Sequence, residues 1–121
     1  MKLDWSSAEE FLKEGTAAGY LMGIIEAEKI FRDFLFQRGF KIRNWSKANQ
    51  ILNPLISQPA EFAQARRIYR RVILEPCFKI GPEETKKTIR RYWQAIEDLN
   101  EAINYLSPRK KLWLKIKCFF I

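Results

Sequence analysis

Two basic clusters have the residue types and the spacing that phosphate binding would need. Each consists of two basic residues, two others and two more basic residues: Arg66, Arg67, Arg70 and Arg71 in the first cluster, and Lys86, Lys87, Arg90 and Arg91 in the second. On a helix this spacing concentrates four positive charges within about two turns. If the two helices are neighbours, the eight side chains could bind RNA or DNA, and Tyr69, Tyr92 or Trp93 could stack on bases.

The alternative is that each quartet is only the solvated face of its helix. This is our preferred interpretation, because long exposed arginines are common. Four acidic residues nearby would balance part of the charge: Glu61, Glu75, Glu83 and Glu84. The net charge of +8 does not decide the matter, because residues 107–121 alone contribute five basic residues and no acidic one.

Catalysis has little support in the sequence. The chain has no histidine, which excludes histidine general bases, imidazole metal ligands and Ser-His or Cys-His nucleophilic pairs. Cys77 follows a proline and is expected to be an inert thiol. Glu97 and Glu101 share a helix face, but no second helix offers a matching acidic pair with histidine, so we expect a solvated face. An enzyme is the least supported interpretation, and we expect neither a metal site nor a cofactor.

The basic C-terminal tail, residues 109–121, could contact a membrane surface or a partner. Its contact residues would be Arg109, Lys110, Lys111, Trp113, Lys115 and Lys117. Apolar residues alternate along it with a period of two, which is typical of a strand, yet a lone strand on a helical domain has no partner. A helical turn packed on the domain and a segment that orders only on a partner are the other two alternatives.

The elements that position these clusters are predicted to be helices. A long central helix spans Thr16 to Arg38 and ends at Gly39, and a short one around Trp45–Leu52 is limited by Pro54. A third helix runs from about Ala60 to Leu74, and a last one opens at Pro82. Its apolar residues alternate at spacings of three and four, a heptad seam: Ile89, Tyr92, Ile96, Leu99, Ile103 and Leu106. The fold class is therefore all-α, an antiparallel bundle of about four helices (residues 1–108) with a basic C-terminal tail.

Three glycines lie four residues apart at the start of the long helix: Gly15, Gly19 and Gly23. Glycine inside a helix costs roughly 1 kcal/mol relative to alanine, so this stripe needs a reason. Our preferred explanation is close packing of a neighbouring helix in the same domain. A close-packed dimer interface is the alternative. Before the long helix, we expect Ser6 or Ser7 to form a capping box with Glu9 or Glu10 and start a short amphipathic turn.

The expected location is the cytoplasm. Charged residues follow the first residues at once, so no secretory signal is expected, and the apolar run in the long helix is far shorter than the roughly 20 residues of a membrane span. Cys77 and Cys118 are isolated from each other and are expected to be reduced thiols.

Part of the chain resembles HEPN-like domains, which are small helical bundles. The resemblance lies in Ala27–Leu35 followed by Arg38 and Gly39, in Ala65–Tyr69, and in Glu83 and Glu84 opening a final long helix. Catalytic members of that family cleave RNA with an arginine and a histidine on the third helix. Arg66, Arg67, Arg70 or Arg71 could supply the arginine, but the histidine is absent, so the resemblance implies a non-nuclease member.

Such members act as binding partners in toxin–antitoxin, defence or nucleotidyltransferase-associated systems and often dimerise. Our first hypothesis is therefore a non-catalytic, HEPN-like binding protein that forms a homodimer, with the glycine stripe and the heptad seam as contact surfaces. The second hypothesis is a nucleic-acid-binding accessory protein that uses the two quartets. The third is a peripheral membrane protein that uses the basic tail.

Overall fold

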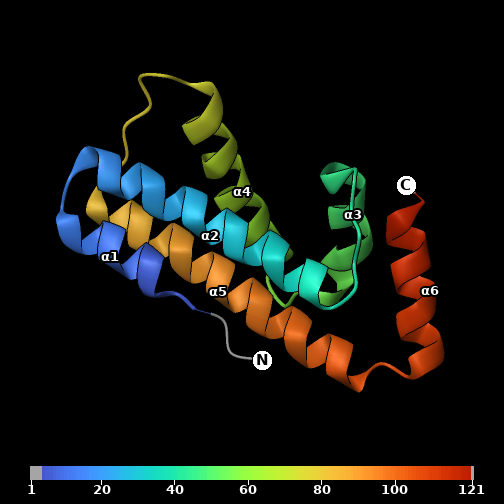
Figure 1. The fold of residues 1–121 in the computed structure, drawn as a ribbon. Coiled ribbons are helices and arrows are strands. Elements are labelled where there is room, and N and C mark those ends of the chain that lie inside the picture. The colour runs from blue at the N-terminus through green and yellow to red at the C-terminus, as the bar shows by residue number, and fades with distance from the viewer. Residues whose placement is uncertain (1–3, 121) are drawn as a thin grey trace.

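Six α-helices make up the part of the chain that the structure, a computed structural model, describes (residues 4–120; Figure 1). The helices are α1 (Ser6–Glu14), α2 (Ala17–Gln37), α3 (Trp45–Leu52), α4 (Pro59–Leu74), α5 (Pro82–Tyr105) and α6 (Pro108–Phe119), and a short 3-10 turn, Asn53–Leu55, follows α3. No strand occurs within residues 4–120. The predicted all-α class is confirmed, and the helices predicted around residues 16–38, 45–52, 60–74 and 82–106 are all present.

The long helix α2 begins and ends at the residues the sequence indicates. The Thr16 hydroxyl accepts a hydrogen bond from the Gly19 amide at 2.9 Å and so caps the first turn. At the other end Gly39 has a φ of +90°, a left-handed conformation that suits glycine. Of the two cap candidates for α3, Asn44 is the one used, since its side-chain oxygen accepts from the Lys47 amide at 3.2 Å.

The start of α1 differs from the expectation. Trp5, not Ser6 or Ser7, precedes the first helical residue, and no capping box forms. The Asp4 carboxylate instead accepts hydrogen bonds from the amide and the hydroxyl of Ser6, which lowers the pKa of Asp4. An acidic side chain two residues earlier therefore does what the serines were expected to do.

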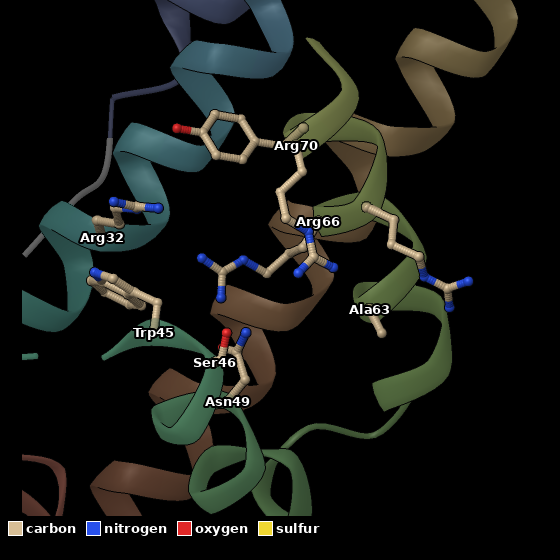
Figure 2. Close-up of a pocket in the computed structure, with 9 residues that line it drawn as sticks. Arg32, Trp45, Ser46, Asn49, Ala63, Arg66 and Arg70 are labelled. Carbon is tan, nitrogen blue, oxygen red and sulfur yellow. The ribbon is translucent and has the colours of Figure 1, made fainter. Parts of the chain in front are cut away.

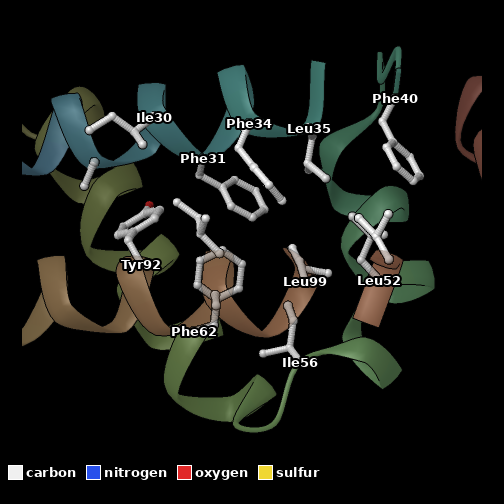
Figure 3. Packing of buried hydrophobic residues seen from close by; sticks show 14 of the residues in the cluster. Ile30, Phe31, Phe34, Leu35, Phe40, Leu52, Ile56, Phe62, Tyr92 and Leu99 are labelled. Carbon is white, nitrogen blue, oxygen red and sulfur yellow. The ribbon is translucent and has the colours of Figure 1, made fainter. Parts of the chain in front are cut away.

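The core lies between α2, α4 and α5 and is rich in aromatic rings (Figure 3). Phe31 and Phe62 pack with ring centroids 4.8 Å apart, and the ring of Tyr92 stands edge-on to Phe62 at 5.4 Å. The predicted heptad seam of α5 faces this core: Tyr92, Ile96, Leu99 and Ile103 are buried, and Ile89 and Leu106 pack against them. The seam is therefore filled from within the chain.

Neighbouring helices do not all run antiparallel. The α1–α2 hairpin turns back at Gly15, and α4 and α5 run in opposite directions where the Glu61 carboxylate meets Arg91. By contrast α2 and α5 are parallel, because Tyr92 meets the middle of α2 while Asn100 and Asn104 accept hydrogen bonds from Arg38 at its end. Figure 1 shows these two long helices side by side, with the intervening α3 and α4 providing the return path.

Residues 109–119 are helical, which matches one of the three alternatives for the tail. Ser107 caps α6 by accepting from the Lys110 amide, and Pro108 is its first residue, so the same dipeptide follows α5 and starts α6. Leu114 and Cys118 are buried in the core cluster. Burial also raises the pKa of the Cys118 thiol. Within residues 4–120 no helix combines the length and the apolar character needed to cross a membrane.

Candidate functional site

Four arginines converge on one cleft between α2, α3 and α4 (Figure 2). The cleft has a volume of about 180 Å³. We call it the arginine cleft after Arg32, Arg66, Arg67 and Arg70, which line it together with Trp45, Ser46, Asn49, Ala63 and Tyr69. The lining residues include no acidic side chain, so the surface of the cleft is strongly positive.

One buried carboxylate organises the cleft from behind. Glu28 on α2 accepts two hydrogen bonds from Arg66, at 3.0 Å from Nε and 2.7 Å from Nη2, and a third from Arg32 Nε. The Tyr92 hydroxyl donates a fourth at 2.8 Å. Both oxygens of Glu28 are thus satisfied, and the two arginines are held in fixed positions on the cleft wall.

Aromatic rings hold the same two guanidinium groups from the sides. The Arg32 Cζ atom lies 4.9 Å from the ring centroid of Trp45 and 5.8 Å from that of Tyr69. Arg66 Cζ lies 5.2 Å from the Phe31 centroid and 5.4 Å from that of Trp45. Such contacts stabilise a guanidinium while leaving its remaining N–H groups free to donate.

Arg66 retains an unused donor in this setting. Its side chain is only 9% exposed, and among the described residues its Nη1 atom has no hydrogen-bond partner. Four guanidinium groups also surround a single carboxylate, which leaves an excess of three positive charges. Because an unsatisfied buried donor is costly, the arrangement favours an anion that would accept from Arg66.

Tyr92 is affected by the same charge distribution. Burial, followed by the negative charge of Glu28 and the hydrogen bond to it, raises the pKa of Tyr92 well above its ordinary value. The hydroxyl is therefore protonated at neutral pH and acts as a donor to Glu28.

The first basic quartet is divided by the structure. Arg66 is buried, while Arg67 and Arg70 are exposed at the mouth of the cleft. Arg71 is exposed elsewhere and pairs with Glu75 at 2.8 Å, which raises the pKa of Arg71. The preferred interpretation, a purely solvated face, is therefore wrong for Arg66 and holds for Arg71.

The second quartet does not join the first in one row of eight charges. Arg91 packs against the opposite side of α4, where it donates to Glu61 at 2.7 Å. Lys86 lies 3.9 Å from Glu83, and Lys87 and Arg90 are exposed on α5. None of these four residues lines the arginine cleft. The expected balance by Glu61, Glu75 and Glu83 is confirmed.

The aromatic residues expected to stack on bases are placed differently from one another. Tyr92 is fully buried in the core, so that part of the expectation is wrong. Tyr69 lines the cleft but packs against the core and contacts Arg32. Trp93 is exposed on α5 and does not line the cleft. The cleft therefore presents guanidinium groups rather than free aromatic faces.

The glycine stripe proposed as a protein interface is used within the domain. Gly15 lies outside α2 as the left-handed cap of α1, with a φ of +66°. Gly19 and Gly23 are buried against α1: a Cβ atom at Gly19 would lie 2.6 Å from the Phe11 carbonyl oxygen, and one at Gly23 would lie 3.8 Å from that of Ala8. The preferred explanation, close packing inside the domain, is confirmed for these two, and the interface expectation is corrected.

The remaining candidates for chemistry are isolated. Glu97 and Glu101 are exposed, as expected of a solvated face, and Cys77 is an exposed free thiol. In the stretch from residue 4 to residue 120 no group of three His, Cys, Asp or Glu side chains is arranged to hold a metal ion. The tail residues Arg109, Lys110, Lys111, Trp113, Lys115 and Lys117 all lie on α6, where only Lys111 and Lys115 are half-buried.

Sequence reasoning missed Glu28 as the organising residue, although a signal exists. Glu28 was expected to pair with Arg32 on the surface; the pair forms, but Glu28 is buried. It stands four residues after Ile24 and three before Phe31, both of which are buried. Arg66 likewise stands four residues after Phe62 and three before Tyr69. A charged residue inside an apolar stripe on each of two helices indicates a buried ion pair.

Comparison with protein-family models, with curated proteins and with solved structures gives no match for this chain.

Proposed function

We propose that this protein is a non-catalytic RNA-binding protein that holds backbone phosphates in the arginine cleft. The observation that carries the proposal is the buried Arg66, which is fixed by Glu28 and has an unused donor on a wall shared with three further arginines. Guanidinium groups bind phosphate through parallel N–H donors, and positioned ones lose little entropy on binding.

The size and the lining of the cleft suit a phosphate better than a base. Its volume of about 180 Å³ is below the roughly 300–1,000 Å³ of pockets that enclose a small organic ligand. Trp45 and Tyr69 are already in contact with Arg32, so stacking on bases is not the expected mode. Arg67 and Arg70 at the mouth can reach the phosphates on either side. Binding of this kind is independent of sequence and strongly dependent on salt.

The resemblance to HEPN-like domains makes RNA the expected form of nucleic acid. The arginines of the cleft lie on the helix that carries the family's catalytic arginine, and the missing histidine argues for binding without cleavage. A place in a toxin–antitoxin, defence or nucleotidyltransferase-associated system belongs to the same proposal. A homodimer would need surfaces other than the glycine stripe and the heptad seam, because both are used inside the chain.

The test compares two double variants of the full chain that remove equal charge. Arg67→Gln/Arg70→Gln alters the mouth of the cleft, and Lys87→Gln/Arg90→Gln is the matched control on α5; all four side chains are exposed. Binding of a fluorescent single-stranded RNA is measured over a range of salt concentrations. We expect the cleft variant to bind at least tenfold more weakly and its log–log salt slope to fall by roughly 0.7 for each lost contact, while the control changes little.

Two results would contradict the proposal. Equal weakening in both variants would show a diffuse basic surface with no special role for the cleft. No binding by the unaltered chain at low salt would exclude nucleic acid as the ligand. A duplex DNA of the same length, measured in parallel, tests the preference for RNA: tighter binding of DNA would overturn that part of the proposal.

A further inference from the structure

The helix α6 has an exposed apolar face that no other element covers. Leu114 and Cys118 are buried, whereas five large apolar side chains of α6 are exposed: Leu112, Trp113, Ile116, Phe119 and Phe120. Leu112 is 60% exposed and Trp113 is 59% exposed, although both are large apolar residues. Figure 1 shows α6 at one end of the molecule, beyond α3. Exposed apolar patches of this kind mark contact surfaces.

The apolar residues gather on the side of α6 that faces away from the core. At 3.6 residues per turn, Leu112, Ile116 and Phe119 follow one another at spacings of four and three and lie opposite Leu114 and Cys118. Trp113 and Phe120 extend this face on one side. The rings of Phe119 and Phe120 contact each other with centroids 4.9 Å apart, so the apolar surface is continuous at its C-terminal end.

Lysines border this face along both edges. By the same helical spacing Lys111 and Lys115 flank it on one side, and Lys110 and Lys117 flank it on the other. The Lys117 ammonium lies 4.6 Å from the ring centroid of Trp113. Arg109 adds a positive charge in the first turn, and α6 has no acidic residue. A broad apolar strip between two rows of cations is typical of a helix that lies at a lipid–water interface.

We propose that α6 docks this protein on an anionic lipid surface, with its apolar face in the outer acyl region and its lysines among the headgroups. Charge complementarity identifies this occupant. A second copy of α6 would bring ten cations together, and a nucleic acid would leave the five apolar side chains without a partner. At 12 residues the helix is shorter than the roughly 20 needed to span a bilayer, so it lies in the interface plane.

The proposal is independent of the arginine cleft, which lies on other helices, and its test uses the full chain. Binding is measured by co-sedimentation with vesicles of phosphatidylcholine alone and of phosphatidylcholine mixed with phosphatidylserine. We expect binding only to the mixed vesicles. The variant Ile116→Ser/Phe120→Ser should bind at least tenfold more weakly, whereas Leu74→Ser, which alters a highly exposed apolar residue on α4, should bind normally.

The lysines are tested in the same way. Lys110→Gln/Lys117→Gln should weaken binding by about fivefold for each lost charge, and Lys86→Gln/Lys87→Gln on α5 should have little effect. Equal losses in both variants would overturn the proposal, because they would show attraction by overall charge without docking of α6.

A fluorescence measurement locates the helix directly. Vesicles with brominated acyl chains should quench tryptophan emission in the unaltered chain. The bromine-dependent quenching should largely disappear in Trp113→Phe and persist in Trp93→Phe, whose tryptophan is exposed on α5. The absence of binding to mixed vesicles, or quenching that survives Trp113→Phe, would overturn the proposal. Binding of an acidic peptide in place of the vesicles would identify a different occupant.

Discussion

Glu28 and Arg66 form a buried ion pair whose net contribution to stability is expected to be small. Their side chains are only 2% and 9% exposed, and removing two charges from water costs several kcal/mol for each ion. Well-packed apolar residues often replace such a pair without loss of stability. A buried arginine that also keeps an unused donor toward a cleft is therefore better explained by binding than by folding. This reasoning at the level of single residues supports the proposed phosphate site.

Tyr92 gives a prediction for the dependence of stability on pH. Its pKa is raised in the folded state above the ordinary value of 10.0, so its contribution to stability is fully present below pH 10 and is lost as the pH rises toward the folded-state pKa. Above pH 10 this one group should lower the free energy of unfolding by about 1.4 kcal/mol for each pH unit. Urea denaturation between pH 8 and about pH 11 measures the effect.

Two variants separate Tyr92 from the other groups that titrate in this range. Tyr92→Phe should lose about 1.5–3 kcal/mol at pH 8, because Glu28 loses a donor, and should show a shallower fall above pH 10. Tyr105→Phe, at an exposed position, should keep the slope of the unaltered chain. An identical slope in all three proteins would show that Tyr92 does not contribute in this way.

The glycines of α2 give a prediction at the level of helix packing. Gly19→Ala should destabilise the fold by about 1–3 kcal/mol, because its Cβ would lie 2.6 Å from a backbone oxygen of α1 that cannot move without shifting the helix. Gly23→Ala is the matched control. Its nearest neighbour is the end of the Ile89 side chain at 3.4 Å, so better helix propensity should leave stability unchanged or raise it by up to about 1 kcal/mol. Thermal denaturation distinguishes the two, and similar losses would contradict the packing argument.

Helices were predictable from the sequence because their signals are local. Thr16 and Gly39 bound α2, and Pro82 opens α5, in agreement with the structure. Only part of the candidate site was predictable. Arg66, Arg67 and Arg70 were identified by their charge, but their partner Glu28 lies 38 residues away from Arg66, and no local rule connects the two.

The contribution of α3 to the site depends on how helices pack. Trp45, Ser46 and Asn49 line the cleft only because α3 lies beside α2 and α4, which the pattern of any single helix does not determine. The basic tail illustrates the same limit. Its period of two suggested a strand, whereas the burial of Leu114 and Cys118 on the core selects a helix.

At the level of the whole molecule, α6 is expected to contribute to the stability of the domain. Leu114→Ala should lower the free energy of unfolding by about 2–5 kcal/mol, because this side chain is part of the buried core. Leu112→Ala, which alters the same residue type at an exposed position of the same helix, should change it by less than about 0.5 kcal/mol. Urea denaturation checks both variants. Equal and small effects would show that α6 is dispensable for folding, as expected of a separate tail.

The parallel arrangement of α2 and α5 has a consequence for the order in which the chain folds. Glu28 meets donors that follow it by 38 residues, at Arg66, and by 64 residues, at Tyr92. The α1–α2 hairpin can form early, since its contacts are local, but it would leave the Glu28 carboxylate in water until α4 and α5 arrive. Closing loops of this length makes the search slower than in a bundle of sequential hairpins. During synthesis the core and the arginine cleft should therefore assemble together, only after α5 has left the ribosome.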